Sequence, residues 1–169
     1  MLSDSPREHP ATPSAVIVIP ARYESSRFPG KPLARIAGRS MIEHVWSRAR
    51  QAPGIDRVII ATDDRRILEA VEAFGGEAVM TRPDHATGTD RIAEVAEGLT
   101  CDIVINVQGD EPLLEPAMVT QVLRAVADDP RAVMGSLRTR LVDRSEYLDP
   151  NVVKVVVDRD DAALYFSRA

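Results

Sequence analysis

Several features are scarce or missing in this sequence of 169 residues, and each absence excludes a class of protein. There is one cysteine, Cys101, so no intrachain disulfide can form, which fits a reducing compartment. No stretch is long and apolar enough to span a membrane. The formal net charge is -5, which argues against a general affinity for nucleic acid, because phosphates demand a basic face.

Motifs that define several large enzyme classes are also missing. The loop 21–38 contains neither a Walker loop nor a G-x-G-x-x-G fingerprint, so P-loop ATPases and dehydrogenases with that fingerprint lose support. No spacing suggests zinc, and no Ser-His-Asp or Cys-His arrangement can be argued. His44 falls near the apolar face of a predicted helix, where a structural role is expected. His85 precedes Gly88 in a polar loop, where it could touch a ligand.

What is present is the composition of an ordinary globular protein. Hydrophobic residues make up 44% and charged residues 28%, and the length suits one compact domain with a real core. Residues 1–14 combine prolines with mixed charges and lack the apolar core of a signal peptide. They are predicted to form a disordered tail, and a cytoplasmic location follows by default. Residues 15–169 are predicted to form a single nucleotide-binding domain.

Short apolar runs alternate with helical patterns along this domain. Val16-Ile17-Val18-Ile19 is typical of a strand that is buried on both faces. Between Met41 and Ala49, apolar residues recur at the spacing of one helix face. Strands that alternate with helices predict an α/β fold with a mostly parallel sheet and helices on both faces. The predicted strands are 15–20, 57–62, 77–80, 102–107, 132–137, 152–157 and 162–166.

Local capping signals predict where the helices begin. Ser40-Met41-Ile42-Glu43 has the form of a capping box, and Pro116 suits a first helical position. Asp63 and Asp64 can cap the second helix, and Thr89 can cap the third. Ligands bind beyond the carboxyl ends of strands in such sheets, so the loops after the first, second and fourth strands become candidate sites.

The loop after the first strand gathers positive charge. Arg22, Arg27 and Lys31 fall within ten positions of one another. With Ser25, Ser26 and the backbone amides, these cations can hold several phosphate oxygens. Lys31 supplies a compact charge suited to a departing phosphate. The alternative interpretation is a solvated basic loop.

The loop after the fourth strand carries carboxylates, in the segment Asn106-Val107-Gln108-Gly109-Asp110-Glu111-Pro112. Asp110 is the predicted Mg²⁺ ligand, because Mg²⁺ prefers one or two carboxylates with water and substrate phosphate. Glu111 could be a second ligand or a base for metal-bound water, and Gln108 could bind a sugar hydroxyl or carboxylate. The alternatives are a turn role for Asp110 and an exposed position for Glu111. Together the cationic and carboxylate loops supply what nucleotidyl transfer needs.

At these residues the sequence resembles the 3-deoxy-manno-octulosonate cytidylyltransferase (CMP-KDO synthetase) family. The resemblance covers nearly the whole chain from Val16 onward. The segments that carry it are Ile19-Pro20-Ala21-Arg22-Tyr23, Arg27-Phe28-Pro29-Gly30-Lys31-Pro32-Leu33, Ala61-Thr62-Asp63, Gly88-Thr89-Asp90-Arg91, Val107-Gln108-Gly109-Asp110-Glu111-Pro112, Asn151-Val152-Val153-Lys154-Val155-Val156 and Ala163-Leu164-Tyr165-Phe166-Ser167-Arg168-Ala169.

The resemblance implies a Rossmann-like fold of the nucleotide-diphospho-sugar transferase type, Mg²⁺ dependence and a homodimer. It implies that the anomeric hydroxyl of KDO attacks the α-phosphate of CTP, which gives CMP-KDO and pyrophosphate. That product serves lipopolysaccharide synthesis in the cytoplasm of Gram-negative bacteria. Neither a nucleic acid nor a membrane partner is implied.

The resemblance also assigns expected roles to single residues. Arg22 and Lys31 match phosphate-binding cations that act in catalysis, and Asp110 matches the catalytic metal-binding aspartate. The expected contacts to the sugar acid are Arg27, Gln108 and Arg168. The expected nucleotide-binding residues are Arg22, Ser25, Ser26, Arg27, Lys31, Thr62, Asp63, Thr87, Gly88 and Thr89.

Family members are expected to continue beyond the position that matches Ala169, into a part with a further metal-binding aspartate. Two alternatives to a KDO enzyme therefore stay open. One is a cytidylyltransferase for another sugar acid such as sialic acid. The other is a truncated nucleotide-binding or interaction protein without catalysis.

Overall fold

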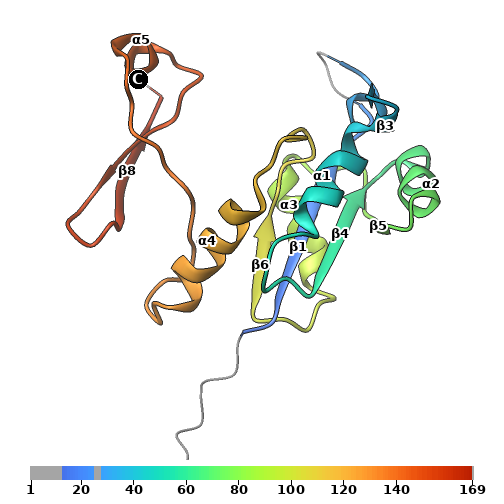
Figure 1. The fold of residues 1–169 in the computed structure, drawn as a ribbon, viewed down its shortest axis with the longest axis horizontal. Helices are drawn as coiled ribbons and strands as arrows, with labels where there is room; N and C mark the ends of the chain where they lie inside the picture. The colour runs from blue at the N-terminus through green and yellow to red at the C-terminus, as the bar shows by residue number, and fades with distance from the viewer. Residues whose placement is uncertain (1–12, 25–27, 169) are drawn as a thin grey trace, which may run out of the picture. The chain divides into compact units, whose positions relative to one another are not determined.

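The computed structural model describes residues 13–24 and 28–168 (Figure 1). The chain divides into two compact units, Met1–Gly135 and Ser136–Ala169. Most of the predicted tail lies outside the described residues, and the single domain predicted for residues 15–169 stays a prediction. Within the described part of the chain, no helix is long and apolar enough to cross a membrane.

A four-stranded parallel sheet in the order β5-β4-β1-β6 forms the centre of the first unit. The run around Ile17 forms the central strand because it can be buried on both faces, and Ile17 and Ile19 are fully buried. The structure thus confirms the predicted parallel α/β sheet. Its strands are β1 (Ala15–Ala21), β4 (Arg57–Thr62), β5 (Glu77–Met80) and β6 (Ile103–Asn106).

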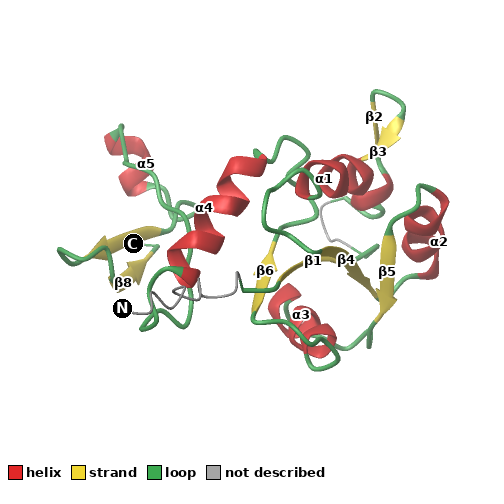
Figure 2. Ribbon diagram, turned by 60° about the horizontal axis from the view of Figure 1, so that its bottom comes forward, coloured by secondary structure: helices red, strands yellow, loops and turns green. Residues whose placement is uncertain are grey.

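Helices cover both faces of this sheet, as the sequence predicts. Figure 2 shows α1 and α2 on one side of the strands and α3 on the other. Alternate residues of β1 serve the two faces: Ile17 belongs to the core that contains Ile42 of α1, and Val18 to the core that contains Ile92 of α3. The helices of this unit are α1 (Met41–Ala49), α2 (Arg65–Ala73), α3 (Gly88–Ala96) and α4 (Pro116–Ala127).

Most of the predicted caps are confirmed. Ser40 accepts a hydrogen bond from the Glu43 amide at 3.3 Å, and Pro116 opens α4. Asp64 is the N-cap of α2, and its pKa is held below the ordinary value chiefly by the hydrogen bond from the Arg66 side chain.

The predicted cap of α3 is wrong. Thr87, and not Thr89, is the N-cap, and Gly88 is the first helical residue. The reason lies in the spacing: Thr87 and Asp90 bond to each other's backbone amides at 3.2 and 2.8 Å. Thr89 has Ile92 three residues later, which cannot return such a bond.

The predicted strand at residues 132–137 does not form. Val133 and Met134 are 98% and 84% exposed. Strand preference reflects packing against neighbouring strands more than an intrinsic backbone tendency, so an apolar run without such packing stays irregular.

Short elements that the sequence did not predict shape the segment around Lys31. A 3-10 helix, η1 (Lys31–Leu33), follows Gly30, whose φ of 71° is left-handed and favours glycine. The antiparallel pair β2 (Arg35–Ile36) and β3 (Arg39–Ser40) leads directly into α1.

The second unit contains a helix and a hairpin. The predicted strands near its end form the antiparallel pair β7 (Lys154–Val157) and β8 (Ala163–Ser167), and α5 (Arg144–Leu148) precedes them. Lys154 is buried, and its ammonium donates to the carbonyls of Asp149 and Arg168 at 2.9 and 3.1 Å. These bonds tie the two ends of the hairpin together.

Candidate active site

Two segments, the loop after β6 and the start of α3, lie close to Pro20 at the carboxyl end of β1. A Cβ atom placed on Gly109 would lie 3.0 Å from the Pro20 carbonyl oxygen, and one on Gly88 would lie 3.2 Å from Pro20 Cγ. Both positions therefore suit glycine, which has no side chain to obstruct the approach. The loop after β6 and the start of α3 thus meet the beginning of the cationic loop, at the sheet edge where the sequence predicts a ligand site.

Lys31 and Asp110, from two loops far apart in the sequence, are in direct contact. The Lys31 ammonium donates to Asp110 Oδ2 at 2.6 Å, and the two side chains are 37% and 50% exposed. The predicted phosphate-binding cation and the predicted metal-binding carboxylate therefore occupy one accessible place. Because both remain accessible to solvent, either can exchange its partner for a ligand of opposite charge.

Tyr23 supports the backbone beside Lys31. Its carbonyl accepts a hydrogen bond from the Gly30 amide at 2.7 Å, and a Cβ atom on Gly30 would lie 3.1 Å from the Tyr23 ring. The Arg66 guanidinium of α2 lies 3.3 Å from the centroid of the same ring. The turn that presents Lys31 is thus closed at its base and packed against α2.

Arg22, the other predicted phosphate-binding cation, points toward the loop before α3. Its Nη2 donates to the His85 carbonyl at 2.6 Å. The remaining N–H groups of the guanidinium fork can still bind phosphate. The predicted contacts Ser25, Ser26 and Arg27 lie outside the described residues.

The residues predicted to surround the nucleoside lie at the ends of β4 and α3. Thr62 is fully buried, and its hydroxyl accepts from the Asp64 amide at 3.2 Å. Thr87 is engaged in the cap of α3. Gly88 and Thr89 form the first turn of that helix, where backbone N–H groups lack partners within the helix and can face a ligand. Their contacts to a nucleotide stay predictions.

Arg91 is a residue that the sequence analysis left without a role. It is fully buried, donates to the Thr81 hydroxyl through Nη1, and donates to Asp63 Oδ2 through Nη2 at 2.6 Å. The Asp63 carboxylate, predicted to approach the nucleotide, is thus tied to α3. In the sequence, the one hint that Arg91 is buried was its position next to the apolar residue Ile92. That hint is weak, because an arginine in a helix is normally exposed.

Of the three predicted contacts to the sugar acid, Arg27 lies outside the described residues, and Gln108 and Arg168 belong to different units. Gln108 is exposed beside Asp110, and its amide donates to Asn106 Oδ1 at 2.9 Å. Arg168 belongs to the second unit, where Nη1 donates to the Pro150 and Asn151 carbonyls at 3.2 and 3.3 Å. Their expected roles toward a sugar acid are not tested by these contacts.

The donor set around Asp110 fits a weakly held divalent cation. Among the described residues, no three His, Cys, Asp or Glu side chains gather as metal ligands. Mg²⁺ does not require such a cage, because it binds through one or two carboxylates and completes its shell with water and substrate phosphates. Asp110 is accessible enough to supply that carboxylate.

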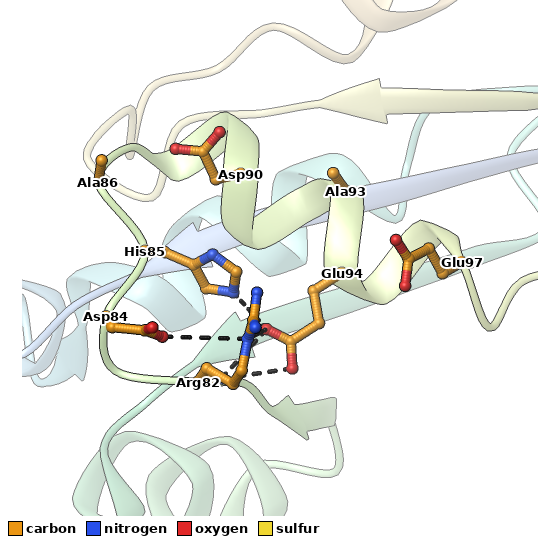
Figure 3. Close-up of a pocket in the computed structure, with 8 residues that line it drawn as sticks. All are labelled: Arg82, Asp84, His85, Ala86, Asp90, Ala93, Glu94 and Glu97. Carbon is orange, nitrogen blue, oxygen red and sulfur yellow. Dashed lines mark hydrogen bonds and ion pairs between the residues drawn. The ribbon is translucent and has the colours of Figure 1, made fainter.

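A hollow of about 700 Å³ in the described surface is a different place (Figure 3). Its polar and charged lining residues are Arg82, Asp84, His85, Asp90, Glu94 and Glu97, and neither Lys31 nor Asp110 contributes to it. Four carboxylates against one arginine repel phosphates. This hollow is therefore not the site for a triphosphate.

Comparisons with known proteins show the family to which the chain belongs. A family model described as cytidylyltransferase matches residues 16–169. The chain is 58% identical over 156 residues to the 3-deoxy-manno-octulosonate cytidylyltransferase of Syntrophotalea carbinolica, and 58% identical over 152 residues to that of Pelobacter propionicus. These matches cover 92% and 90% of this chain but 62% and 60% of the relatives, so it spans about three fifths of their length.

Solved structures show the same fold. A CMP:2-keto-3-deoxy-manno-octonic acid synthetase complexed with CTP matches with a TM-score of 0.84 at 49% identity, over 92% of this chain and 64% of that one. A 4-diphosphocytidyl-2C-methyl-D-erythritol synthase matches with a TM-score of 0.62 at 13% identity, over 92% of this chain and 71% of that one. The second likeness concerns the fold alone.

Proposed function

The chain belongs to the cytidylyltransferase family, and from this membership we propose that it binds CTP and transfers CMP to the anomeric hydroxyl of KDO. The observation that supports the proposal most directly is the contact of Lys31 with Asp110 at the carboxyl edge of the sheet. A cation for phosphate and a carboxylate for a metal meet there, in a chain similar to a KDO-activating enzyme that binds CTP.

In the proposed reaction, the anomeric hydroxyl of KDO attacks the α-phosphorus of CTP through its oxygen and releases its proton to water. The bond from that phosphorus to the bridging oxygen of the β-phosphate breaks, and pyrophosphate leaves with the electron pair. Arg22 and Lys31 hold the triphosphate, and Lys31 neutralises charge that develops on the departing group. The first-turn amides of α3 face the nucleotide, as anions favour a helix N-terminus.

Mg²⁺ would be held by Asp110. When bound, it supplies charge neutralisation on the phosphates and polarises the attacking hydroxyl. When the nucleotide enters, Lys31 moves from Asp110 to a phosphate oxygen, and the freed carboxylate is then available to the cation. Gln108, which is exposed and lies two residues before Asp110, is proposed to bind the sugar acid.

A second candidate function is nucleotide binding without turnover. The observation that favours it is that Lys31 and Asp110, in contact at 2.6 Å, are residues expected to bind phosphate and metal, and neither is expected to bind the sugar acid. The homodimer, the cytoplasmic location and the service to lipopolysaccharide synthesis also stay predictions from the resemblance.

Release of pyrophosphate by the purified chain tests the proposal. The reaction contains CTP, KDO and Mg²⁺, and the controls replace CTP by UTP or KDO by sialic acid. We expect pyrophosphate release only in the reaction that contains both CTP and KDO, and none when UTP or sialic acid replaces either substrate. Binding of CTP without release would support the second candidate function, and release with sialic acid but not KDO would show that the proposed sugar acid is wrong.

A further inference from the structure

Three neighbouring side chains of α3 hold the loop 81–87 that precedes this helix. Asp90 bonds to the Thr87 amide and hydroxyl, and Arg91 bonds to the Thr81 hydroxyl. Glu94, one turn further along, bonds to the middle of the loop. The loop is thus fastened at both ends and at its centre by one helix.

The central fastening is the contact between Glu94 and His85. Figure 3 shows the imidazole turned toward the Glu94 carboxylate, and Nε2 bonds to Oε2. The same carboxylate oxygen accepts from the Arg82 amide at 3.1 Å. The His85 side chain is 6% exposed, whereas that of Glu94 is 30% exposed. The ring of His85 is therefore buried against Glu94, with little surface open to a ligand.

The backbone of His85 makes a second contact, to Arg22. Its carbonyl accepts the 2.6 Å hydrogen bond from Nη2 of Arg22, the side chain that emerges where β1 ends. A free arginine side chain loses much rotamer freedom when it binds phosphate. An arginine that is already held by one N–H loses less, and its other donors remain directed at the ligand.

We propose that Glu94 and His85 are positioning residues, which hold the Arg22 guanidinium in place for the triphosphate. Glu94 fixes the His85 ring, the ring fixes the loop backbone, and the His85 carbonyl fixes Arg22. Neither residue needs to touch the nucleotide. The inference rests on the proposed function, because it takes Arg22 as a phosphate ligand.

A double-mutant cycle on CTP binding tests this role. The dissociation constant of CTP with Mg²⁺ is measured by calorimetry, below the unfolding transition, for wild type, Glu94→Ala, His85→Leu, Arg22→Ala and the doubles with Arg22→Ala. We expect Glu94→Ala and His85→Leu each to weaken binding about tenfold, the effect of one charge-assisted hydrogen bond. In the Arg22→Ala background, both should change binding less than about twofold.

Two further variants separate positioning from general loosening of the fold. His85→Gln keeps a donor near the place of Nε2 and should restore binding to within about threefold of wild type. Glu97→Ala removes an exposed carboxylate at the C-cap position directly after the same helix and should leave binding unchanged.

The outcomes distinguish this role from the proposed function. Weakening by Arg22→Ala but not by Glu94→Ala would overturn the positioning role and leave the function standing. Equal weakening by Glu94→Ala in both backgrounds would also overturn it, because the effect would not pass through Arg22. Unchanged affinity in Arg22→Ala, or no CTP binding by wild type, would refute the phosphate role of Arg22 and the positioning role with it.

Discussion

At the residue scale, Lys31 is expected to contribute binding and not stability. An ion pair as exposed as Lys31 with Asp110 is worth about 0–1 kcal/mol, so its loss leaves the fold intact. Lys31→Ala should weaken CTP binding by about tenfold or more, since one charge-assisted contact to the triphosphate is lost. Calorimetric titration with CTP checks this. A matched control is Arg35→Ala, in the exposed strand β2 that follows, where no loss of affinity is expected.

Asp110 is the second residue whose role can be isolated. Asp110→Asn keeps the size and polarity of the side chain but removes the negative charge that Mg²⁺ prefers. Turnover that depends on Mg²⁺ should fall by about a hundredfold or more, as for other single electrostatic contributions to a transition state. The unfolding temperature should stay close to that of wild type. Pyrophosphate release across a range of Mg²⁺ concentrations is the measurement, and wild-type rates in the variant would remove Asp110 from the metal site.

Glu94 predicts a dependence of stability on pH. Its pKa is held below the ordinary value of 4.5, chiefly by the hydrogen bond from the His85 side chain, with further help from the Arg82 amide and charge. A carboxyl whose pKa is lower in the folded state stabilises the fold above its ordinary pKa, and this contribution is lost as pH falls through the folded value. Wild type should therefore unfold at a higher temperature than Glu94→Gln near neutral pH.

The difference between these two proteins should shrink as pH falls from 4.5 through the lower pKa of folded Glu94, because the carboxylate is then protonated and resembles glutamine. Thermal unfolding of both at a series of pH values measures it. The same gap at all pH values would mean that the carboxylate charge of Glu94 does not stabilise the loop.

At the scale of elements, Gly30 controls how η1 presents Lys31. Its φ of 71° is left-handed, and a Cβ atom would also press on the Tyr23 ring at 3.1 Å. Gly30→Ala should cost about 1–2 kcal/mol and weaken CTP binding, because the turn must shift to relieve the strain. Gly38→Ala, at φ of 87° with open space around it, is the matched control: it should cost similar stability but leave CTP affinity unchanged.

Elements were predicted well where local pattern and burial agree. The run around Ile17 is typical of a buried strand, and Pro116 suits the first position of a helix, and the structure has both. The prediction of a strand at residues 132–137 was wrong because strand preference depends on neighbouring strands, which a sequence does not show. The cap at Thr89 failed because two threonines compete, and only Thr87 has an acidic partner, Asp90, at the right spacing.

Within the candidate site, the sequence identified the groups but not their partners. It placed Lys31 and Asp110 in separate loops, and the fold brings them into contact. It left Arg91 without a role, because burial of an arginine depends on Asp63 and Thr81 from two other loops. Contacts of this kind are set by tertiary packing and leave no periodic pattern in the chain.

At the scale of the whole molecule, the hydrophobic core and most of the candidate site belong to the first of the two units. Among the residues that the structure describes, the buried hydrophobic ones lie between Ala15 and Leu123, all in the first unit. The same unit contains Arg22, Lys31, Asp110 and the start of α3. The nucleotide half of the proposed reaction is thus built on the better packed part of the chain, whereas Arg168 lies in the second unit.

A calorimetric titration of the wild-type chain with CTP in the presence of Mg²⁺, with UTP as the comparison, tests most directly whether the Lys31 and Asp110 edge binds a nucleotide. We expect saturable binding of CTP with one site per chain, and weaker binding of UTP, because the loops at the edge of the sheet distinguish the base. Equal affinity for both would contradict the choice of cytosine. No binding of either nucleotide would contradict the assignment of the Lys31 and Asp110 edge as a nucleotide site.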